Sequence, residues 1–144
     1  MQNIESVLEE KKIFIGKTAG DSMEPMLCEG RDTVIIVPPV FPLKTGDVPV
    51  YRRDGHYTMH RIIKATKKRY YIAGDNRQSL ETDIKESDIV GVLAAFYKEK
   101  TYVSCDDPVY LDYTKKMCRR FKGLLWMHTV KCAYGKILKF CKGR

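Results

Sequence analysis

A serine in a turn bounded by glycine and proline is the first residue of this sequence that could do chemistry. Ser22 lies within the run Gly20-Asp21-Ser22-Met23-Glu24-Pro25-Met26-Leu27. A serine hydroxyl becomes an effective nucleophile only when a base takes its proton and nearby N–H groups receive the developing charge. Gly20 lets the backbone approach a substrate closely, and Pro25 stiffens the turn. An ordinary turn serine would have the same local sequence, so the chemistry depends on the other residues.

A histidine further along the chain is the candidate base. His60 lies in the run Met59-His60-Arg61-Ile62-Ile63. A neutral imidazole accepts a proton near neutral pH without the strong desolvation that a lysine base requires. A strand histidine bonded to a backbone carbonyl is the structural alternative. His56 follows Asp54-Gly55 at a predicted hairpin tip and is assigned no role.

An acid is expected beside this histidine, because a histidine base needs a partner that holds its tautomer and stabilises the imidazolium. The candidates are Asp75, Glu81 and Asp83. Asp75 sits in Gly74-Asp75-Asn76, where an aspartate that caps its own turn is an equal alternative. The residues leave the choice among the three acids open.

Four short segments keep a fixed order: the Ser22 run, Gly46-Asp47-Val48, the His60 run and Gly74-Asp75-Asn76. This ordered set resembles the type I signal peptidases, specifically the branch found in the endoplasmic reticulum and in spore-forming bacteria, over about residues 20–92. The resemblance implies that Ser22 is the nucleophile. It also implies that His60 replaces the lysine base of the bacterial leader peptidases and the related LexA-type repressors.

The resemblance further implies a functional acid several residues after Gly-Asp-Asn, an offset that falls on Glu81 with Asp83 two residues beyond. It implies an oxyanion hole made by the Ser22 backbone N–H and a second donor from the preceding turn. The candidate substrate contacts are Gly20, Asp21, Met23, Pro25 and Met26. The two methionines are equally compatible with a plain core position.

The function implied by this resemblance is a serine endopeptidase that cleaves leader or signal segments from small peptides or proteins. Two alternatives remain: a LexA-like self-cleaving regulatory module, and a catalytically idle peptidase-fold domain that binds a partner. The self-cleaving module would need a DNA-binding domain before the serine, and the polar N-terminal segment is too short for one. Ala19-Gly20 is also too close to Ser22 to fold back into the same site.

The elements that must position these residues are short β-strands separated by turn signals. Apolar or β-branched runs occur at 33–37, 48–51, 57–65, 69–73, 89–97 and 101–104. Asp54-Gly55 predicts a hairpin that places His60 on its returning strand. We therefore predict a mainly β fold, a partly closed antiparallel β domain of the LexA/signal peptidase type with a C-terminal helical appendage.

The predicted boundaries are a catalytic β domain over residues 1–105, with a short helix at 3–12, and a basic amphipathic helical tail over 106–144. The net charge of +8 comes from this tail, since Lys115 to Arg144 holds no acid. Two arrangements are open for the tail helix. It could lie in a membrane interface through Leu124, Leu125, Trp126 and Phe140, or it could pack its apolar face on the β domain.

Partners and compartment follow from the same composition. Five cysteines without a CxxC pair indicate reduced thiols, and no apolar run is long enough to span a membrane. We expect a cytoplasmic protein, peripheral to the membrane if the tail binds lipid, with a leader-bearing peptide or protein as substrate and no nucleic acid partner. No metal-ligand spacing or phosphate-binding loop occurs, so we expect no metal and no cofactor.

Overall fold

Two antiparallel sheets make up the β domain in the computed structural model, which describes residues 3–142, with the side chains of 138 and 140–142 left out. The larger sheet has the strand order β1 (Phe14–Lys17), β2 (Thr33–Val37), β8 (Ile89–Lys98), β3 (Pro49–Arg53) and β4 (His56–Met59), with β9 (Thr101–Ser104) paired to β8. The smaller sheet contains β5 (Arg61–Ala65), β6 (Tyr70–Ala73) and β7 (Glu81–Ile84). The predicted mainly β, antiparallel fold is confirmed.

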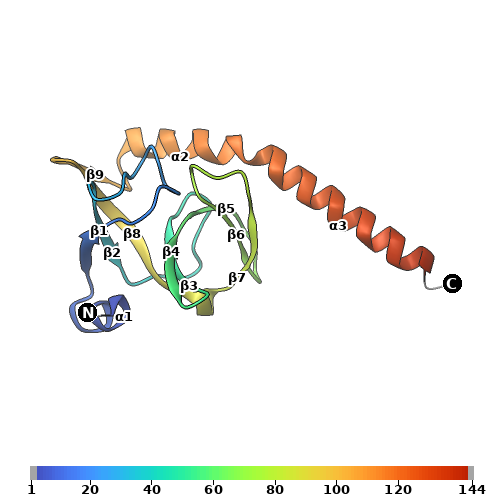
Figure 1. Cartoon of the computed structure of the whole chain (residues 1–144), viewed down its shortest axis with the longest axis horizontal. Helices are drawn as coiled ribbons and strands as arrows, with labels where there is room; N and C mark the ends of the chain where they lie inside the picture. The colour runs from blue at the N-terminus through green and yellow to red at the C-terminus, as the bar shows by residue number, and fades with distance from the viewer. Residues whose placement is uncertain (1–2, 143–144) are drawn as a thin grey trace.

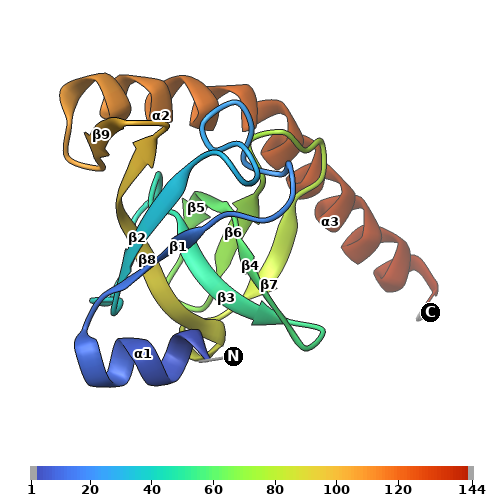
Figure 2. The same cartoon turned by 60° about the vertical axis from the view of Figure 1, so that its left-hand side comes forward.

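The larger sheet is strongly curled (Figures 1 and 2). Its register shifts between Ile35 and Ile36 where β2 pairs with β8, and between Val50 and Tyr51 where β3 pairs with β8. Bulges of this kind bend a strand and increase its twist. The curl leaves β1 and β4 as edge strands at opposite ends of the path.

The chain changes sheets at the candidate base. The predicted strand over 57–65 is divided, because β4 ends at Met59 and β5 begins at Arg61. Ile62 N–H donates to the carbonyl of Asp47, and Gly46 N–H donates to the carbonyl of Ile62, both at 2.8 Å. These bonds draw β5 away from the β3–β4 hairpin. His60 therefore lies at the junction of the two sheets, and its predicted position on the returning hairpin strand was wrong.

The helices lie outside the two sheets. They are α1 (Ile4–Lys11), the short 3-10 helix η1 (Glu86–Asp88), α2 (Pro108–Arg120) and α3 (Lys122–Lys142). The Asp107 carboxylate accepts the N–H of Val109, and Pro108 occupies the first turn, so α2 begins with a strong N-terminal signal. The region predicted as one amphipathic tail is thus two helices, and α3 projects away from the domain (Figure 1).

α2 packs against the β domain. Its buried residues are Tyr110, Thr114 and Met117, and Phe121 at its C-cap is also buried. Met117 and Phe121 share a core cluster with Ile63 of β5. Because these side chains leave water together, α2 is held on the smaller sheet by apolar burial.

A buried ion pair joins the smaller sheet, the loop after β6 and α2. Arg61 and Asp75 are fully buried, and the Arg61 Nε and Nη2 atoms bond the two Asp75 carboxylate oxygens at 2.8 and 2.7 Å. Arg61 Nη1 donates to Thr114 Oγ1 at 2.9 Å and to the Gly46 carbonyl at 3.1 Å. Burial lowers the pKa of Arg61, but its bonds and charge interaction with Asp75 outweigh this and the net pKa is raised.

Removing one member of this pair should unfold the domain more easily. Arg61→Met leaves the Asp75 carboxylate buried without its counter-ion, and we expect a loss of about 3–5 kcal/mol in the free energy of unfolding. Urea denaturation measures the change. Arg52→Met is the matched control, since Arg52 is exposed and pairs with Glu5 at the surface, and it should cost about 1 kcal/mol or less. Equal losses for the two variants would contradict the assigned role of the pair.

Candidate active site

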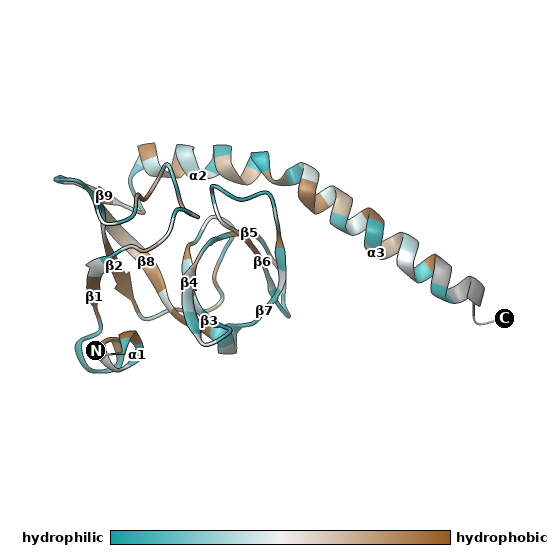
Figure 3. Cartoon of the chain, in the orientation of Figure 1, coloured by the Kyte–Doolittle hydropathy of each residue, from teal (hydrophilic) through white to brown (hydrophobic). Residues whose placement is uncertain are grey.

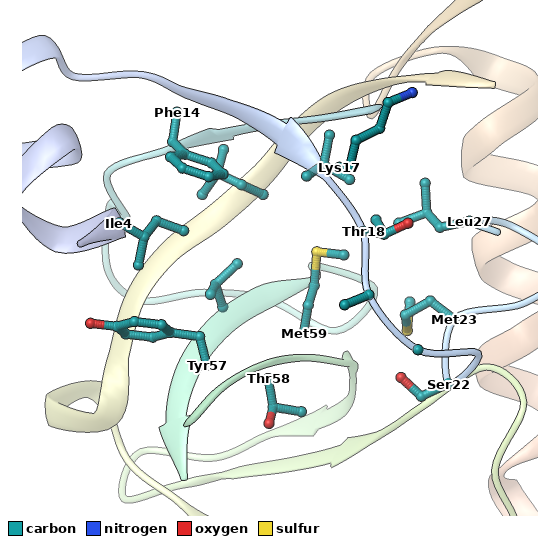
Figure 4. A pocket seen from close by; sticks show the side chains of 15 residues that line it. Ile4, Phe14, Lys17, Thr18, Ser22, Met23, Leu27, Tyr57, Thr58 and Met59 are labelled. Atoms are coloured by element: carbon teal, nitrogen blue, oxygen red, sulfur yellow. The ribbon is translucent and has the colours of Figure 1, made fainter. Parts of the chain in front are cut away.

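The Ser22 turn is anchored to the main core by buried side chains that follow the serine. Met23 and Leu27 are buried in the main core cluster, and Leu27 N–H donates to the Met23 carbonyl at 3.0 Å. Gly20 adopts a φ of +79°, in the left-handed region that favours glycine. Ser22 itself is only half-buried and lines a cavity (Figure 4). The buried residues therefore hold the turn rigidly, and the turn exposes the Ser22 hydroxyl to the cavity.

The loop after β6 lies directly against this turn. Asn76 N–H donates to the Ser22 carbonyl at 2.9 Å, and its side-chain amide donates to the Asp21 carbonyl at 3.2 Å. A Cβ on Gly74 would lie 2.7 Å from the Ser22 carbonyl oxygen and 3.2 Å from Cδ2 of His60. Only glycine leaves room for that approach. Gly74 thus brings the Ser22 backbone and the His60 ring to the same point.

His60 is held by two partners on one ring nitrogen. Its Nδ1 lies 2.9 Å from Oε1 of Glu81 and 2.9 Å from the hydroxyl of Tyr51. The Tyr51 hydroxyl in turn donates to the same Glu81 oxygen at 2.9 Å. An ionised carboxylate can only accept, so Nδ1 carries the ring proton and Nε2 remains free to accept one. Within residues 3–142, no hydrogen bond joins Ser22 Oγ to His60.

The surroundings keep Glu81 ionised and Tyr51 protonated. Burial raises the pKa of the Glu81 carboxyl, but hydrogen bonds from His60 and Tyr51, with the charges of His60 and Arg53, outweigh it and the net pKa is lowered. Burial, and then the charge of Glu81, raises the pKa of Tyr51. Glu81 therefore presents a negative acceptor to the Nδ1–H of His60, and the neutral Tyr51 hydroxyl, which donates its own proton to Glu81, accepts from the same N–H.

The other two predicted acids lie elsewhere. Asp75 is enclosed by Arg61 and also accepts the Tyr113 hydroxyl at 3.0 Å, so its carboxylate serves the buried ion pair. Asp83 is exposed and lies 3.7 Å from Arg53. Of the three candidates, Glu81 is the acid that the structure brings to His60.

Of the five predicted substrate contacts, two line the cavity and three do not. Gly20 and Met23 line the cavity beside Ser22. Met26 is buried, with its sulfur 3.0 Å from Arg61 Nη2, and is a core residue. The carbonyl of Pro25 accepts from Lys98 on the side of the turn. Asp21 is exposed and pairs with Arg77 at 2.6 Å, a hydrogen bond that lowers its pKa.

The cavity has a volume of about 320 Å³ and runs between β1 and β4, the strands at the two ends of the larger sheet's path. One wall is β1 with residues 18–20 that follow it, and the other is residues 57–59 of β4 (Figure 4). Its floor is apolar and consists of Met23, Leu27, Val34, Ile36 and Val50. Tyr57 donates to Glu5 of α1 at 2.8 Å, so α1 borders the end away from Ser22.

Two residues of the site were missed by the sequence analysis. Tyr51 was taken only as part of an apolar strand, and nothing in its neighbourhood distinguishes a strand tyrosine that bonds a histidine from one that fills the core. Gly74 gave a signal, since it begins Gly74-Asp75-Asn76, but its contacts with Ser22 and His60 come from tertiary structure.

The sequence of this chain matches the model of a known protein family. The model of a family described as Peptidase S24-like matches residues 2–94, which is more than half of the chain. The matched region contains Ser22, Tyr51, His60, Gly74 and Glu81. A search of curated proteins finds no match.

Replacement of the acid should change how stability depends on pH. Because the pKa of Glu81 is lowered from its ordinary value of 4.5, the ionised carboxylate stabilises the fold above that pH, and the contribution is lost as pH falls through the folded-state pKa. We expect Glu81→Gln to lower the melting temperature at neutral pH, and we expect this difference from the parent protein to shrink only as the pH falls from 4.5 through the lowered folded-state pKa. Thermal melts across pH measure the difference.

The matched control is the exposed Asp83→Asn, which should melt close to the parent protein at every pH. A melting difference for Glu81→Gln that stays constant down to acid pH would show that the ionised form of Glu81 contributes nothing to stability.

Proposed function

Because the chain belongs to the Peptidase S24-like family, we propose that it is a serine endopeptidase in which Ser22 is the nucleophile and His60 is the general base. One observation carries the assignment. Nδ1 of His60 is held by Glu81, while Gly74 lies against both the His60 ring and the backbone carbonyl of Ser22. A base oriented by an acid beside a serine in a rigid turn is the arrangement that acyl transfer needs.

The proposed reaction uses the free ring nitrogen of His60. As Ser22 Oγ attacks the scissile carbonyl carbon, Nε2 accepts the hydroxyl proton, and the carbonyl oxygen takes up the negative charge. The tetrahedral intermediate collapses when Nε2 returns the proton to the leaving amine, which gives an acyl ester on Ser22. Water, deprotonated by the same nitrogen, then hydrolyses the ester and restores both side chains.

Glu81 and Tyr51 have positioning roles in this reaction. The Glu81 carboxylate stabilises the imidazolium that forms at each proton transfer and keeps the proton on Nδ1 between transfers. Tyr51 is fully buried and bonds both partners, which fixes the angle of the ring. We assign the oxyanion hole to the backbone N–H of Ser22 with a second donor from the turn that precedes it.

We infer that the substrate binds as an extended strand in the cavity between β1 and β4. Both are edge strands, so their outer backbone groups can pair with an added peptide, which is a common mode of peptide recognition. The apolar floor suits uncharged side chains next to the scissile bond. An unstructured leader or signal segment fits such a site, because it can become extended without unfolding a domain. We assign catalysis to the β domain of residues 1–105.

Loss of the nucleophile is the direct test of this function. We expect the purified protein to cleave members of a peptide library, and Ser22→Ala to lower the rate by about 10⁴-fold or more. Mass spectrometry identifies the cleaved bonds, and Ser87→Ala, an exposed serine of η1, is the control with unchanged activity. Cleavage that survives Ser22→Ala would remove the nucleophile assignment. Fragments of the chain itself, formed only when Ser22 is present, would favour the self-cleaving alternative.

The hydroxyl of Tyr51 should affect the chemical step rather than substrate binding. Tyr51→Phe keeps the buried ring but removes both hydrogen bonds, so we expect kcat to fall about tenfold while KM changes little. Steady-state kinetics on a cleaved peptide separate the two constants. Tyr102→Phe, an exposed tyrosine of β9, is the matched control. An equal change in both variants, or a rise in KM alone, would contradict the positioning role.

A further inference from the structure

The helix α3 turns its apolar face away from the β domain. Its contacts with the domain come from Leu124 and Leu125, which pack on the cluster of Ile63 and Phe121, and from His128. The His128 ring meets Tyr71 of β6 edge-on, with 5.6 Å between the ring centroids. All three side chains are half-buried. The domain therefore uses one side of the first two turns of α3.

The other side of α3 is a row of large exposed side chains. They are Trp126, Met127, Val130, Tyr134 and Ile137, between 46% and 69% exposed. At about 100° per residue these five positions fall within an arc of about 100°. Lys131, Lys136 and Lys139 lie outside this arc and are exposed. Figure 3 shows the apolar and polar positions alternating along the projecting helix.

The two options that the sequence left open for the tail divide along α3: Leu124 and Leu125 pack on the β domain, Trp126 is exposed, and the side chain of Phe140 lies outside the described ones. Packing on the β domain would have hidden the row from Trp126 to Ile137, and instead that row is in water. Monomeric proteins rarely leave such a continuous apolar face uncovered, and a face of this kind usually marks an interaction surface.

The charge around the face favours one kind of partner. From Lys115 onward the sequence holds lysines and arginines but no aspartate or glutamate. Pairing two copies of α3 through this face would set two basic helices side by side without an acid to oppose their charge, and like-charge repulsion disfavours that arrangement. An anionic lipid surface supplies negative charge beside the lysines and an apolar layer for the exposed row. Trp126 and Tyr134 are the aromatic types that concentrate at membrane interfaces.

The length and composition of the helix indicate how it would lie. Within residues 3–142, no helix combines the length and apolarity needed to cross a membrane. A helix with one apolar face and lysines outside it lies in the plane of the interface. We propose that α3 docks this protein on an anionic membrane surface, with Trp126, Met127, Val130, Tyr134 and Ile137 inserted and the lysines near the headgroups. The inference goes beyond the proposed peptidase activity and does not require it.

The sequence provides its own probe for this docking, because Trp126 is the single tryptophan. The Ser22→Ala protein is mixed with vesicles of equimolar phosphatidylglycerol and phosphatidylcholine, or of phosphatidylcholine alone, so that catalysis plays no part. We expect co-sedimentation with the anionic vesicles and a shift of Trp126 fluorescence to shorter wavelength. Phosphatidylcholine alone or high salt should weaken both signals, since lysines contribute to the attraction.

Two double variants in the Ser22→Ala protein separate insertion from charge. Val130→Glu with Ile137→Glu places two acids on the apolar face and should lower the partition constant about tenfold or more. Thr129→Glu with Cys132→Glu adds the same charge at exposed positions outside the face, and should lower it much less. The exposed sites keep both variants folded, which circular dichroism checks.

The outcomes decide the proposal. Tighter binding to anionic vesicles, a Trp126 shift and a larger loss for the face variant support it. Absence of binding, or equal losses in the two double variants, would overturn it. Sedimentation velocity without lipid tests the alternative that a second copy of the chain covers this face. A dimer that only the face variant dissociates would support that alternative and would also overturn the membrane proposal.

Discussion

Arg61 and Asp75 are both withdrawn from water, and neither charge could remain there without the other, because a lone buried ion carries a desolvation cost of several kcal/mol. Their positions in the sequence give the pair its importance. Arg61 directly follows His60, and Asp75 directly follows Gly74. The bonds between Arg61 and Asp75 therefore also fix the distance between their neighbours, His60 and Gly74, and Gly74 contacts Ser22. The same guanidinium reaches Thr114, so the position of α2 depends on it as well.

The candidate site is assembled from both sheets at the place where the chain passes from one to the other. Tyr51 comes from the larger sheet and Glu81 from the smaller, and both reach Nδ1 of His60 between them. Ser22 comes from a turn that neither sheet contains, and its position depends on buried Met23 and Leu27 and on the loop at Asn76. Each group is therefore held by its own contacts. The geometry at His60 depends on all of these contacts being formed together.

The sequence predicted the parts of this structure that local patterns control. The strands 33–37 and 101–104 begin and end where the patterns placed them, since runs rich in β-branched residues between turn signals suffice to define them. The break at His60 was not predicted, because residues 57–65 form one continuous β-like run and the break comes from tertiary bonds of Arg61 and Ile62. The strand of Glu81 was missed because its sequence, Glu-Thr-Asp-Ile, is polar. The choice among three acids, and the direction in which α3 faces, likewise depend on packing that no local pattern carries.

The end strands β1 and β4 of the larger sheet both border the cavity, and this affects how the protein behaves at high concentration. An exposed edge strand normally invites pairing with the edge of another molecule, and this is a route to aggregation. Here β1 and β4 border the same cavity, whose walls are the two strands themselves. A second folded copy has the same curled sheet, so it cannot place a flat sheet edge in the cavity between β1 and β4. A single extended peptide can enter the cavity. The curl that creates the cavity thus also shields β1 and β4 from pairing with another folded molecule.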